Sequence, residues 1–202
     1  MSTKPQRLGV FGGAFDPPHT GHVALAQLAV QQLQLDQLRI FPTGQAWHKS
    51  RPLTAATHRV AMARLAFGHL SQVVVDERET QRAGPTYTVD TLRELVAEHP
   101  GTQLFLLMGE DQAKALPSWH EWQEVPKLAI ICVAAREDSA SGSARFVPPS
   151  GLASRFCQLL LPAMPVSATE IRSQIAHPNG VAPMVAEPVA RYIALHHLYQ
   201  TA

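Results

Sequence analysis

The sequence predicts an α/β fold built on a doubly wound, mostly parallel sheet, with a small helical part at the C-terminus, about residues 162–202. Short apolar runs that suit buried strands alternate along the chain with longer segments in which apolar residues recur at helical spacing. Of the 202 residues, 46% are hydrophobic, which is enough to bury the core of one domain over residues 1–202.

The predicted elements follow one another in β-α-β order. Between the strands lie three helical segments, at residues 23–33, 55–67 and 89–98. Two further helices are predicted near the C-terminus, one beginning after Ser167 and one over residues 188–198. Residues 137–151 are rich in Ser, Ala, Gly and Pro and predict a surface loop. The predicted strands are residues 8–11, 38–41, 73–75, 104–108, 128–133 and 157–161.

Three polar segments follow predicted strands directly, at residues 12–22, 42–49 and 109–111. Sheets of this Rossmann-like kind bind ligands outside the carboxyl ends of their strands, where the strand order reverses. We therefore expect these three segments to meet at one binding site.

Residues 12–22 carry the most informative pattern, Gly-Gly-Ala-Phe-Asp-Pro-Pro-His-Thr-Gly-His. The glycines let the backbone turn and approach a ligand closely, and the predicted helix then begins near His19 and His22. A helix N-terminus attracts phosphate, and residues three apart share one helix face, so both histidines can contact one polyphosphate. The alternative is that the histidines are solvated residues at a helix cap. The chain contains no G-x-x-x-x-G-K-[ST] segment, and this segment does not read G-x-G-x-x-G, which excludes two other phosphate loops.

A second segment, Ser167-Ala168-Thr169-Glu170-Ile171-Arg172, also marks a helix start. Ser167 and Glu170 have the spacing of a capping box, which is a structural alternative to a binding role for the serine.

The first of these segments resembles the HxGH signature of the nucleotidylyltransferase superfamily, and the second resembles the element whose helix N-terminus and arginine hold the triphosphate opposite it. The resemblance implies transfer of a nucleotidyl group from a nucleoside triphosphate with release of pyrophosphate. Negative charge grows on the phosphate oxygens during such a transfer, so positioned donors and cations carry the catalysis and no nucleophilic side chain is needed. His19, His22 and Arg172 are the implied catalytic residues.

Several further segments together resemble the bacterial-type nicotinate-nucleotide adenylyltransferase family: residues 76–79, 85–88, 91–92, 109–111, 117–122 and 187–193. The resemblance spans nearly the whole chain. It implies an enzyme of NAD biosynthesis that joins ATP to nicotinic acid mononucleotide. Mg²⁺ is expected on the triphosphate, because it keeps several waters and uses substrate phosphates. No protein-bound transition metal is predicted, because the other histidines show no ligand spacing with carboxylates or cysteines.

The resemblance also implies the two groups of binding residues. Trp119 would stack on the pyridine ring, while the Thr88 hydroxyl and the His120 backbone N–H would bind the nicotinate carboxylate. The ATP group is Gly12, Gly13, Phe15, His19, His22, Gly109, Asp111, Arg136, Ser167 and Arg172; the mononucleotide group is Asp16, Thr43, His48, Thr86, Tyr87, Thr88, Trp119 and His120.

Structural alternatives exist for four of these assignments. Trp119 suits a core or rim aromatic, residues 86–88 suit the cap of the helix that follows them, Asp111 suits a helix N-cap, and Arg136 suits a solvated side chain. The chain also departs from the family at Thr43-Gly44, where the family commonly has Asn-Asn, and at Trp47, which replaces a usual proline.

Composition limits the remaining possibilities. The net charge is +1, which gives no support for broad binding to nucleic acid or membrane and suits a small anionic substrate. Cys132 and Cys157 lie in apolar runs without C-x-x-C spacing, so we predict core thiols in a cytoplasmic protein, with no signal peptide. An oligomer is compatible with the sequence. The rival functions are a same-fold transferase that acts on nicotinamide mononucleotide or another phosphate acceptor, and a nucleotide-binding module without turnover.

Overall fold

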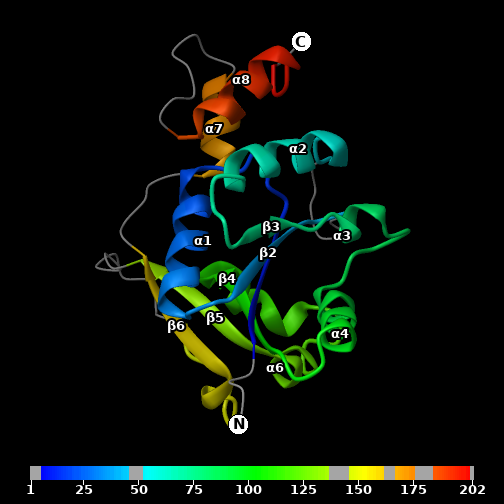
Figure 1. Cartoon of the computed structure of the whole chain (residues 1–202), viewed down its shortest axis with the longest axis vertical. Helices are drawn as coiled ribbons and strands as arrows, with labels where there is room; N and C mark the ends of the chain where they lie inside the picture. The colour runs from blue at the N-terminus through cyan, green and yellow to red at the C-terminus, as the bar shows by residue number, and fades with distance from the viewer. Residues whose placement is uncertain (1–5, 46–51, 137–145, 162–166, 176–183, 201–202) are drawn as a thin grey trace.

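The computed structural model describes residues 6–45, 52–136, 146–161, 167–175 and 184–200. Its centre is a six-stranded sheet in the order β3-β2-β1-β4-β5-β6, in which every neighbouring pair of strands is parallel (Figure 1). The predicted α/β fold is confirmed. The strands are β1 Arg7–Gly13, β2 Gln37–Pro42, β3 Val73–Val75, β4 Gln103–Gly109, β5 Ala129–Arg136 and β6 Phe156–Leu161.

The long helices lie where the sequence predicts them, and three short helices were not predicted. The short ones, of four to six residues, are α3, α5 and α6. Leu128, which the sequence assigns to a strand, is the last residue of α6. The helices are α1 Thr20–Gln32, α2 Ala56–Phe67, α3 Arg78–Gln81, α4 Thr88–Glu98, α5 Glu110–Ala115, α6 Val125–Leu128, α7 Ala168–Ile175 and α8 Glu187–Leu195, with 3₁₀ turns η1 Leu116–Ser118 and η2 Ala153–Arg155.

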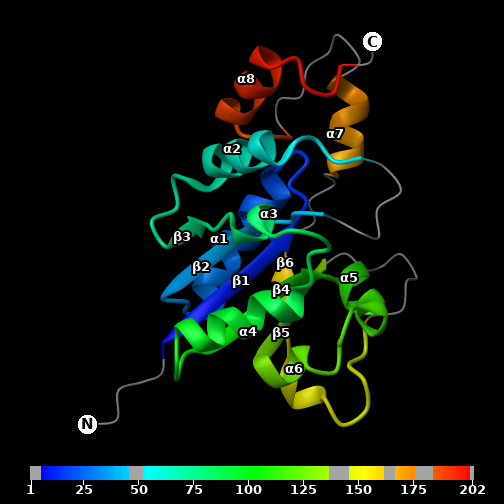
Figure 2. The ribbon, with the colours of Figure 1, turned by 90° about the vertical axis from the view of Figure 1, so that its right-hand side faces the viewer.

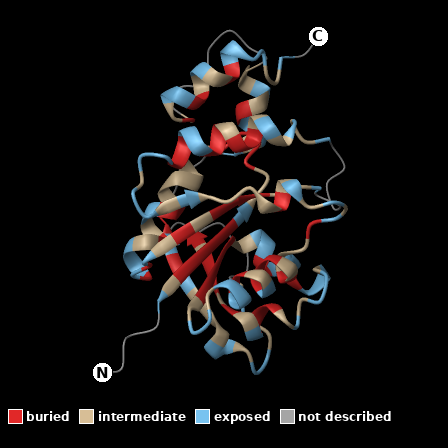
Figure 3. Ribbon diagram, turned by 45° about the vertical axis from the view of Figure 1, so that its right-hand side comes forward, coloured by how far each residue is buried: buried red, intermediate tan, exposed pale blue. Residues whose placement is uncertain are grey.

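The sheet is buried on both faces, as alternate strand residues show. In β4, Leu104 and Leu106 pack in the core cluster shared with α4, whereas Phe105 and Leu107 pack in the cluster shared with α1 and α2. Successive side chains of a strand point to opposite faces, so two helical layers cover the sheet. Figure 3 shows the resulting concentration of buried residues along the central strands.

The C-terminal helices extend one of these layers. Ile171 of α7, together with Val189 and Ile193 of α8, belongs to the same apolar cluster as Phe15 and the sheet. Figure 2 shows α7 and α8 beyond α2, at the end of the molecule opposite the N-terminus. The C-terminal part therefore shares its core with the sheet domain.

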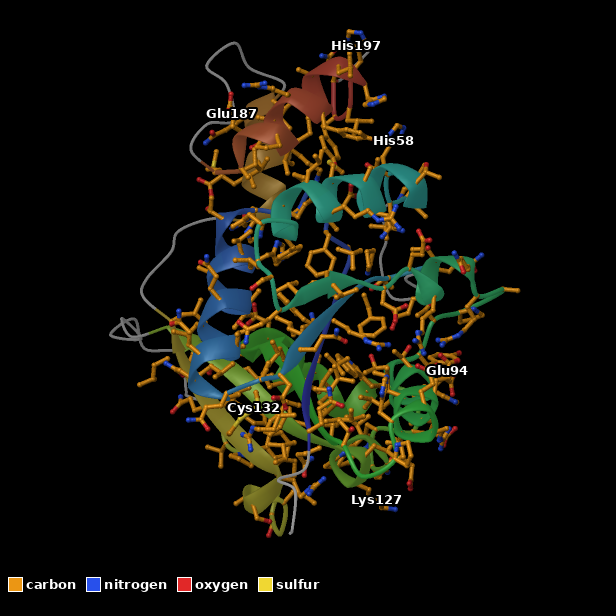
Figure 4. All side chains as sticks on the ribbon, in the orientation of Figure 1. His58, Glu94, Lys127, Cys132, Glu187 and His197 are labelled. Atoms are coloured by element: carbon orange, nitrogen blue, oxygen red, sulfur yellow. A yellow bond between two sulfur atoms is a disulfide. The ribbon has the colours of Figure 1, made fainter. Side chains whose placement is uncertain are left out.

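Cys132 and Cys157 form a disulfide, so the prediction of two core thiols is wrong. The two residues lie directly opposite each other in the parallel pair β5 and β6, with their Cα atoms 4.7 Å apart. That separation lies within the range that a disulfide can bridge. Figure 4 labels Cys132, which is fully buried.

The strand order places the binding region. The chain leaves β1 toward β2 and β3 on one side of the sheet and returns to β4, β5 and β6 on the other. The reversal lies between β1 and β4, and a ligand is expected outside the carboxyl ends of these strands. Among the described residues, no helix is long and apolar enough to cross a bilayer.

Candidate active site

The two histidines of the first motif lie at the start of α1, after the loop that follows β1. His19 is the N-cap residue of α1, and its backbone N–H donates to Nδ1 of His22 at 3.2 Å. The two rings stack with their centroids 3.6 Å apart. Because Nδ1 of His22 accepts, the neutral ring carries its proton on Nε2, which makes that nitrogen a hydrogen-bond donor.

His19 is held in the neutral form by its surroundings. Burial lowers the pKa of His19 from 6.5 to about 4. Its Nδ1 atom is buried and has no hydrogen-bond partner in the described structure. Gly21 allows the arrangement, because a Cβ atom there would lie only 3.2 Å from the His19 ring.

Phe15 fixes the loop between β1 and the histidines. Its φ of 46° lies in the left-handed region, and its side chain is only 1% exposed. The ring meets Phe11, Phe67 and His22 edge-on, with the His22 centroid 5.1 Å away. Packing of this kind can hold a strained backbone, which is found mostly at functional sites.

A buried arginine that the sequence analysis missed supports the same loop. Arg59 of α2 is 2% exposed, and it donates to the carbonyls of Ala14, at 3.0 Å, and Thr54, at 2.8 Å. Burial lowers its pKa, and nearby Asp16 opposes that shift. Helical spacing could have found it, because Arg59 precedes the buried residues Ala63 and Ala66 by four and seven positions.

Arg172 brings the second motif to the first. Its Nη1 donates to the backbone carbonyl of Asp16 at 2.8 Å, and its Nη2 donates to the Thr169 hydroxyl at 3.1 Å. Ser167 accepts the Glu170 N–H at 3.1 Å, so the serine does cap α7. Residues 156 positions apart in the sequence thus meet in the loop that leads to the histidines.

The predicted pyridine-binding residues gather around the start of α4. Tyr87 is the N-cap residue and Thr88 is the first residue of α4. The ring of His120 stacks on that of Tyr87 with the centroids 4.2 Å apart. Trp119 is half-buried and packs against the core cluster under α4. The half-buried position of Trp119 and the capping position of residues 86–88 do not prevent these residues from contacting a ligand.

The residues that follow β2 contact both the end of β1 and the backbone of Glu79. The Thr43 N–H donates to the Gly13 carbonyl at 2.9 Å, which sets Thr43 beside the end of β1. Gly44 is packed so closely on the Glu79 carbonyl that any side chain there would overlap it. Buried Thr86 donates to that carbonyl at 3.5 Å. The departure from the family at residues 43–44 therefore has a packing reason at Gly44.

Glu79 is a buried carboxyl group beside this cluster. Its side chain is 5% exposed and accepts the Thr91 hydroxyl at 2.8 Å. Burial raises its pKa to about 7, although the hydrogen bond from Thr91 and the charge of Arg82 oppose the rise.

The remaining predicted residues lie at the ends of β4 and β5 or outside the described structure. Gly109 ends β4 and is itself the N-cap of α5, so the alternative of an N-cap role for Asp111 is wrong. Asp111 is exposed in the first turn of α5. Arg136 is the last residue of β5. His48 lies outside the described residues.

Comparisons with known proteins identify the family of this chain. A family model described as cytidylyltransferase-like matches residues 10–174. A probable nicotinate-nucleotide adenylyltransferase of Albidiferax ferrireducens is 61% identical over 98% of this chain and 100% of its own length. A relative of the same description from Methylibium petroleiphilum is 44% identical over 98% of this chain and 95% of its own length. This chain belongs to the nicotinate-nucleotide adenylyltransferase family.

Solved structures support the fold of this nucleotidyltransferase. The nicotinic acid mononucleotide adenylyltransferase of Plasmodium falciparum complexed with APC superposes with a TM-score of 0.77 at 17% identity, over 96% of this chain and 97% of that one. The same enzyme complexed with NaAD gives a TM-score of 0.74 at 16% identity, over the same shares of both chains. The family predicted from the sequence is confirmed.

Proposed function

We propose that this chain joins ATP and nicotinic acid mononucleotide, giving nicotinic acid adenine dinucleotide and pyrophosphate in NAD biosynthesis. The observation that carries the proposal is the contact of Arg172 with the Asp16 carbonyl, at 2.8 Å. It ties the start of α7, with its cation, to the loop that leads to the paired histidines at the start of α1, which supports the proposal.

The reaction is a displacement at the α-phosphorus of ATP. A phosphate oxygen of the mononucleotide forms the new P–O bond, and the bond to the pyrophosphate oxygen breaks with its electron pair leaving on pyrophosphate. Nε2–H of His22 and the N–H groups of α1 can donate to phosphate oxygens as charge grows on them. Arg172 offers a fixed, bidentate cation for the departing pyrophosphate.

His19 contributes as a neutral group. With a pKa of about 4 it offers a nitrogen hydrogen bond to phosphate and no permanent charge. A neutral donor beside a cationic Arg172 fits a site that must release pyrophosphate after turnover. His19, His22 and Arg172 are the proposed catalytic residues, with Gly12, Gly13 and Phe15 shaping the loop and Ser167 capping α7.

Mg²⁺ enters this proposal as part of the substrate, MgATP. The described residues contain no group of three or more His, Cys, Asp or Glu side chains that could hold a metal ion. Octahedral Mg²⁺ commonly keeps several waters and uses substrate phosphates in place of a full protein cage.

The acceptor binds on the side of α4 in this proposal. Trp119 stacks on the pyridine, and Thr88 with the His120 N–H receives the carboxylate, near the stacked Tyr87 and His120 rings. Gly109 and Asp111 serve the adenosine ribose. The other proposed contacts are Arg136 for ATP, and Thr43, His48 and Thr86 for the mononucleotide; Asp16, which the sequence predicts as a contact, is only 2% exposed and is assigned instead to holding the loop.

The test is pyrophosphate release from MgATP with nicotinic acid mononucleotide and nicotinamide mononucleotide, each at subsaturating concentration, so that kcat/KM values are compared. We expect a strong preference for the acid. A preference for the amide would overturn the acceptor assignment, and no release with either would favour another acceptor or a binding-only protein.

Two variants test the residue roles. Arg172→Met should lower kcat by about a hundredfold or more, by analogy with the loss of one transition-state donor. Arg191→Met is the matched control, because Arg191 is exposed on α8 and pairs only with Glu187 among the described contacts. His22→Ala should lower kcat far more than ATP affinity, and equal losses in both would contradict its assignment.

A further inference from the structure

Tyr199, near the end of the chain, contacts the loop that joins β1 to α1. Its hydroxyl donates to Oδ1 of Asp16 at 2.6 Å, across 183 positions of sequence. We propose that Tyr199 is a positioning residue for adenylyl transfer, which holds the Asp16 carboxylate and thereby fixes the loop that leads to His19 and His22. The inference rests on the proposed function and adds a residue to it.

Asp16 is the point at which the loop is fastened. Its side chain is 2% exposed, and Oδ2 accepts the Thr54 N–H at 3.3 Å. Its backbone carbonyl accepts from Arg172 at 2.8 Å. Three separate segments therefore hold one residue that lies three positions before His19.

The charges around Asp16 favour a neutral hydroxyl donor at this place. Arg59 and Arg172 supply positive charge nearby, and the Asp16 carboxylate in turn opposes the fall in the pKa of Arg59. Burial and Asp16 together raise the pKa of Tyr199, so the phenol keeps its proton. A buried carboxylate that lost this donor would keep part of its hydrogen-bonding capacity unsatisfied.

The end of the chain is shaped to make this contact. After α8, the Leu198 N–H donates to the Ile193 carbonyl at 3.0 Å, and Tyr199 follows with a φ of 63° in the left-handed region. Leu198 and Tyr199 both pack on the main apolar cluster, and the Tyr199 hydroxyl lies 4.0 Å from the sulfur of Met62. Ordering the last turn in this conformation costs free energy, which the contact with Asp16 helps to offset.

Tyr199 acts through Asp16 and not on the substrate. The carboxylate that it holds is buried, and the step from Asp16 to His19 contains only Pro17 and Pro18. Because the two prolines restrict the backbone, a shift of Asp16 should also move the histidines. Misplacement of about 1 Å at a reacting group can cost about a hundredfold in rate, so loss of one fastening point should be visible in kcat.

The experiment compares Tyr199→Phe with Tyr192→Phe. The second variant is the matched control, because the Tyr192 hydroxyl also leaves the C-terminal segment, but it bonds Nδ1 of His58 on α2 at 2.9 Å; Figure 4 labels His58. We expect Tyr199→Phe to lower kcat by about tenfold with both KM values within about twofold, and Tyr192→Phe to keep kcat. Phenylalanine keeps the ring and its packing, and melting curves of both variants check that they fold.

A double-mutant cycle tests whether Tyr199 affects kcat through Asp16. In an Asp16→Asn background, Tyr199→Phe should change kcat by less than about threefold, because the two residues act as one unit. Ring resonances of His19 and His22 in the free protein should shift in Tyr199→Phe and stay in place in Tyr192→Phe.

Wild-type kcat in Tyr199→Phe, an equal loss in Tyr192→Phe, or full additivity with Asp16→Asn would each overturn the inference. Absence of turnover in the wild-type protein would instead refute the proposed function, so the two failures are distinguishable.

Discussion

The stability of this protein should depend on pH through Glu79. This carboxyl group on α3 is buried, and the Thr91 hydroxyl of α4 donates to it at 2.8 Å. Burial raises its pKa from 4.5 to about 7, with added repulsion from Asp76 and Glu94. In the unfolded chain the group returns to its ordinary pKa, so folding couples to proton uptake between these two values.

The sign and size of this pH dependence follow from the difference between the native and unfolded pKa values of Glu79. Between pH 4.5 and about 7 the native state keeps the Glu79 proton and the unfolded state loses it, so the free energy of unfolding falls as pH rises. Below this window the contribution is fully present, and above it the native state bears the whole cost of a buried charge. The two pKa values give a loss of roughly 2–3 kcal/mol between pH 5 and pH 8.

Urea unfolding of the wild-type protein and of Glu79→Gln at pH 5, 6, 7 and 8 measures this effect. Glutamine keeps an oxygen that accepts from Thr91 but cannot titrate, so the difference between the two proteins isolates Glu79. We expect similar stabilities at pH 5 and a more stable variant at pH 8. Glu77→Gln, at a half-exposed neighbouring position, is the control and should run parallel to the wild type. Parallel curves for Glu79→Gln would refute the reasoning.

Three further predictions concern the site and its supports. Gly44→Ala should lower the free energy of unfolding by about 2 kcal/mol in urea titrations, because its Cβ overlaps the Glu79 carbonyl, whereas Gly12→Ala, with nothing within 4 Å, should not. The ring NMR resonances of His19 should not titrate between pH 5.5 and 8 in the free protein, since its pKa is about 4; a midpoint near 6.5 would contradict its burial. Arg59→Met should cost about 3 kcal/mol in the same unfolding assay, because two buried carbonyls lose their donor; an unchanged midpoint would show that the arginine is dispensable.

The elements that sequence patterns could predict are those long enough to show a period. The strands are recognisable as continuous apolar runs, the helices α1, α2 and α4 as longer segments with apolar residues at helical spacing, and the structure contains all of them. Helices α3 and α6 have four residues and α5 has six, which is too short for a 3.6-residue period to be recognised.

The errors concern long-range pairing. Whether Cys132 and Cys157 can bond depends on the register between β5 and β6, and no spacing in the sequence states that register. Likewise, the sequence placed Arg59 on a helix but did not show that its guanidinium would be buried against the loop of the first motif. The position of the motif glycines and histidines between β1 and α1 was predictable because one short segment holds both the turn and the start of the helix.

The C-terminal part supports the proposed active site, because the sheet alone does not hold the loop that leads to the histidines. The segment from Gly12 to His22 leaves the sheet, so strand pairing no longer holds its backbone beyond Gly13. Its fixed points come from distant segments: Tyr199 and Arg172 both bond Asp16, and the Met184 carbonyl accepts the backbone N–H and the hydroxyl of Thr20, at 2.9 and 3.2 Å. In the proposed mechanism this loop aims two histidines at one phosphate and gains its rigidity from these contacts, so the last turns of the chain help to position the histidines.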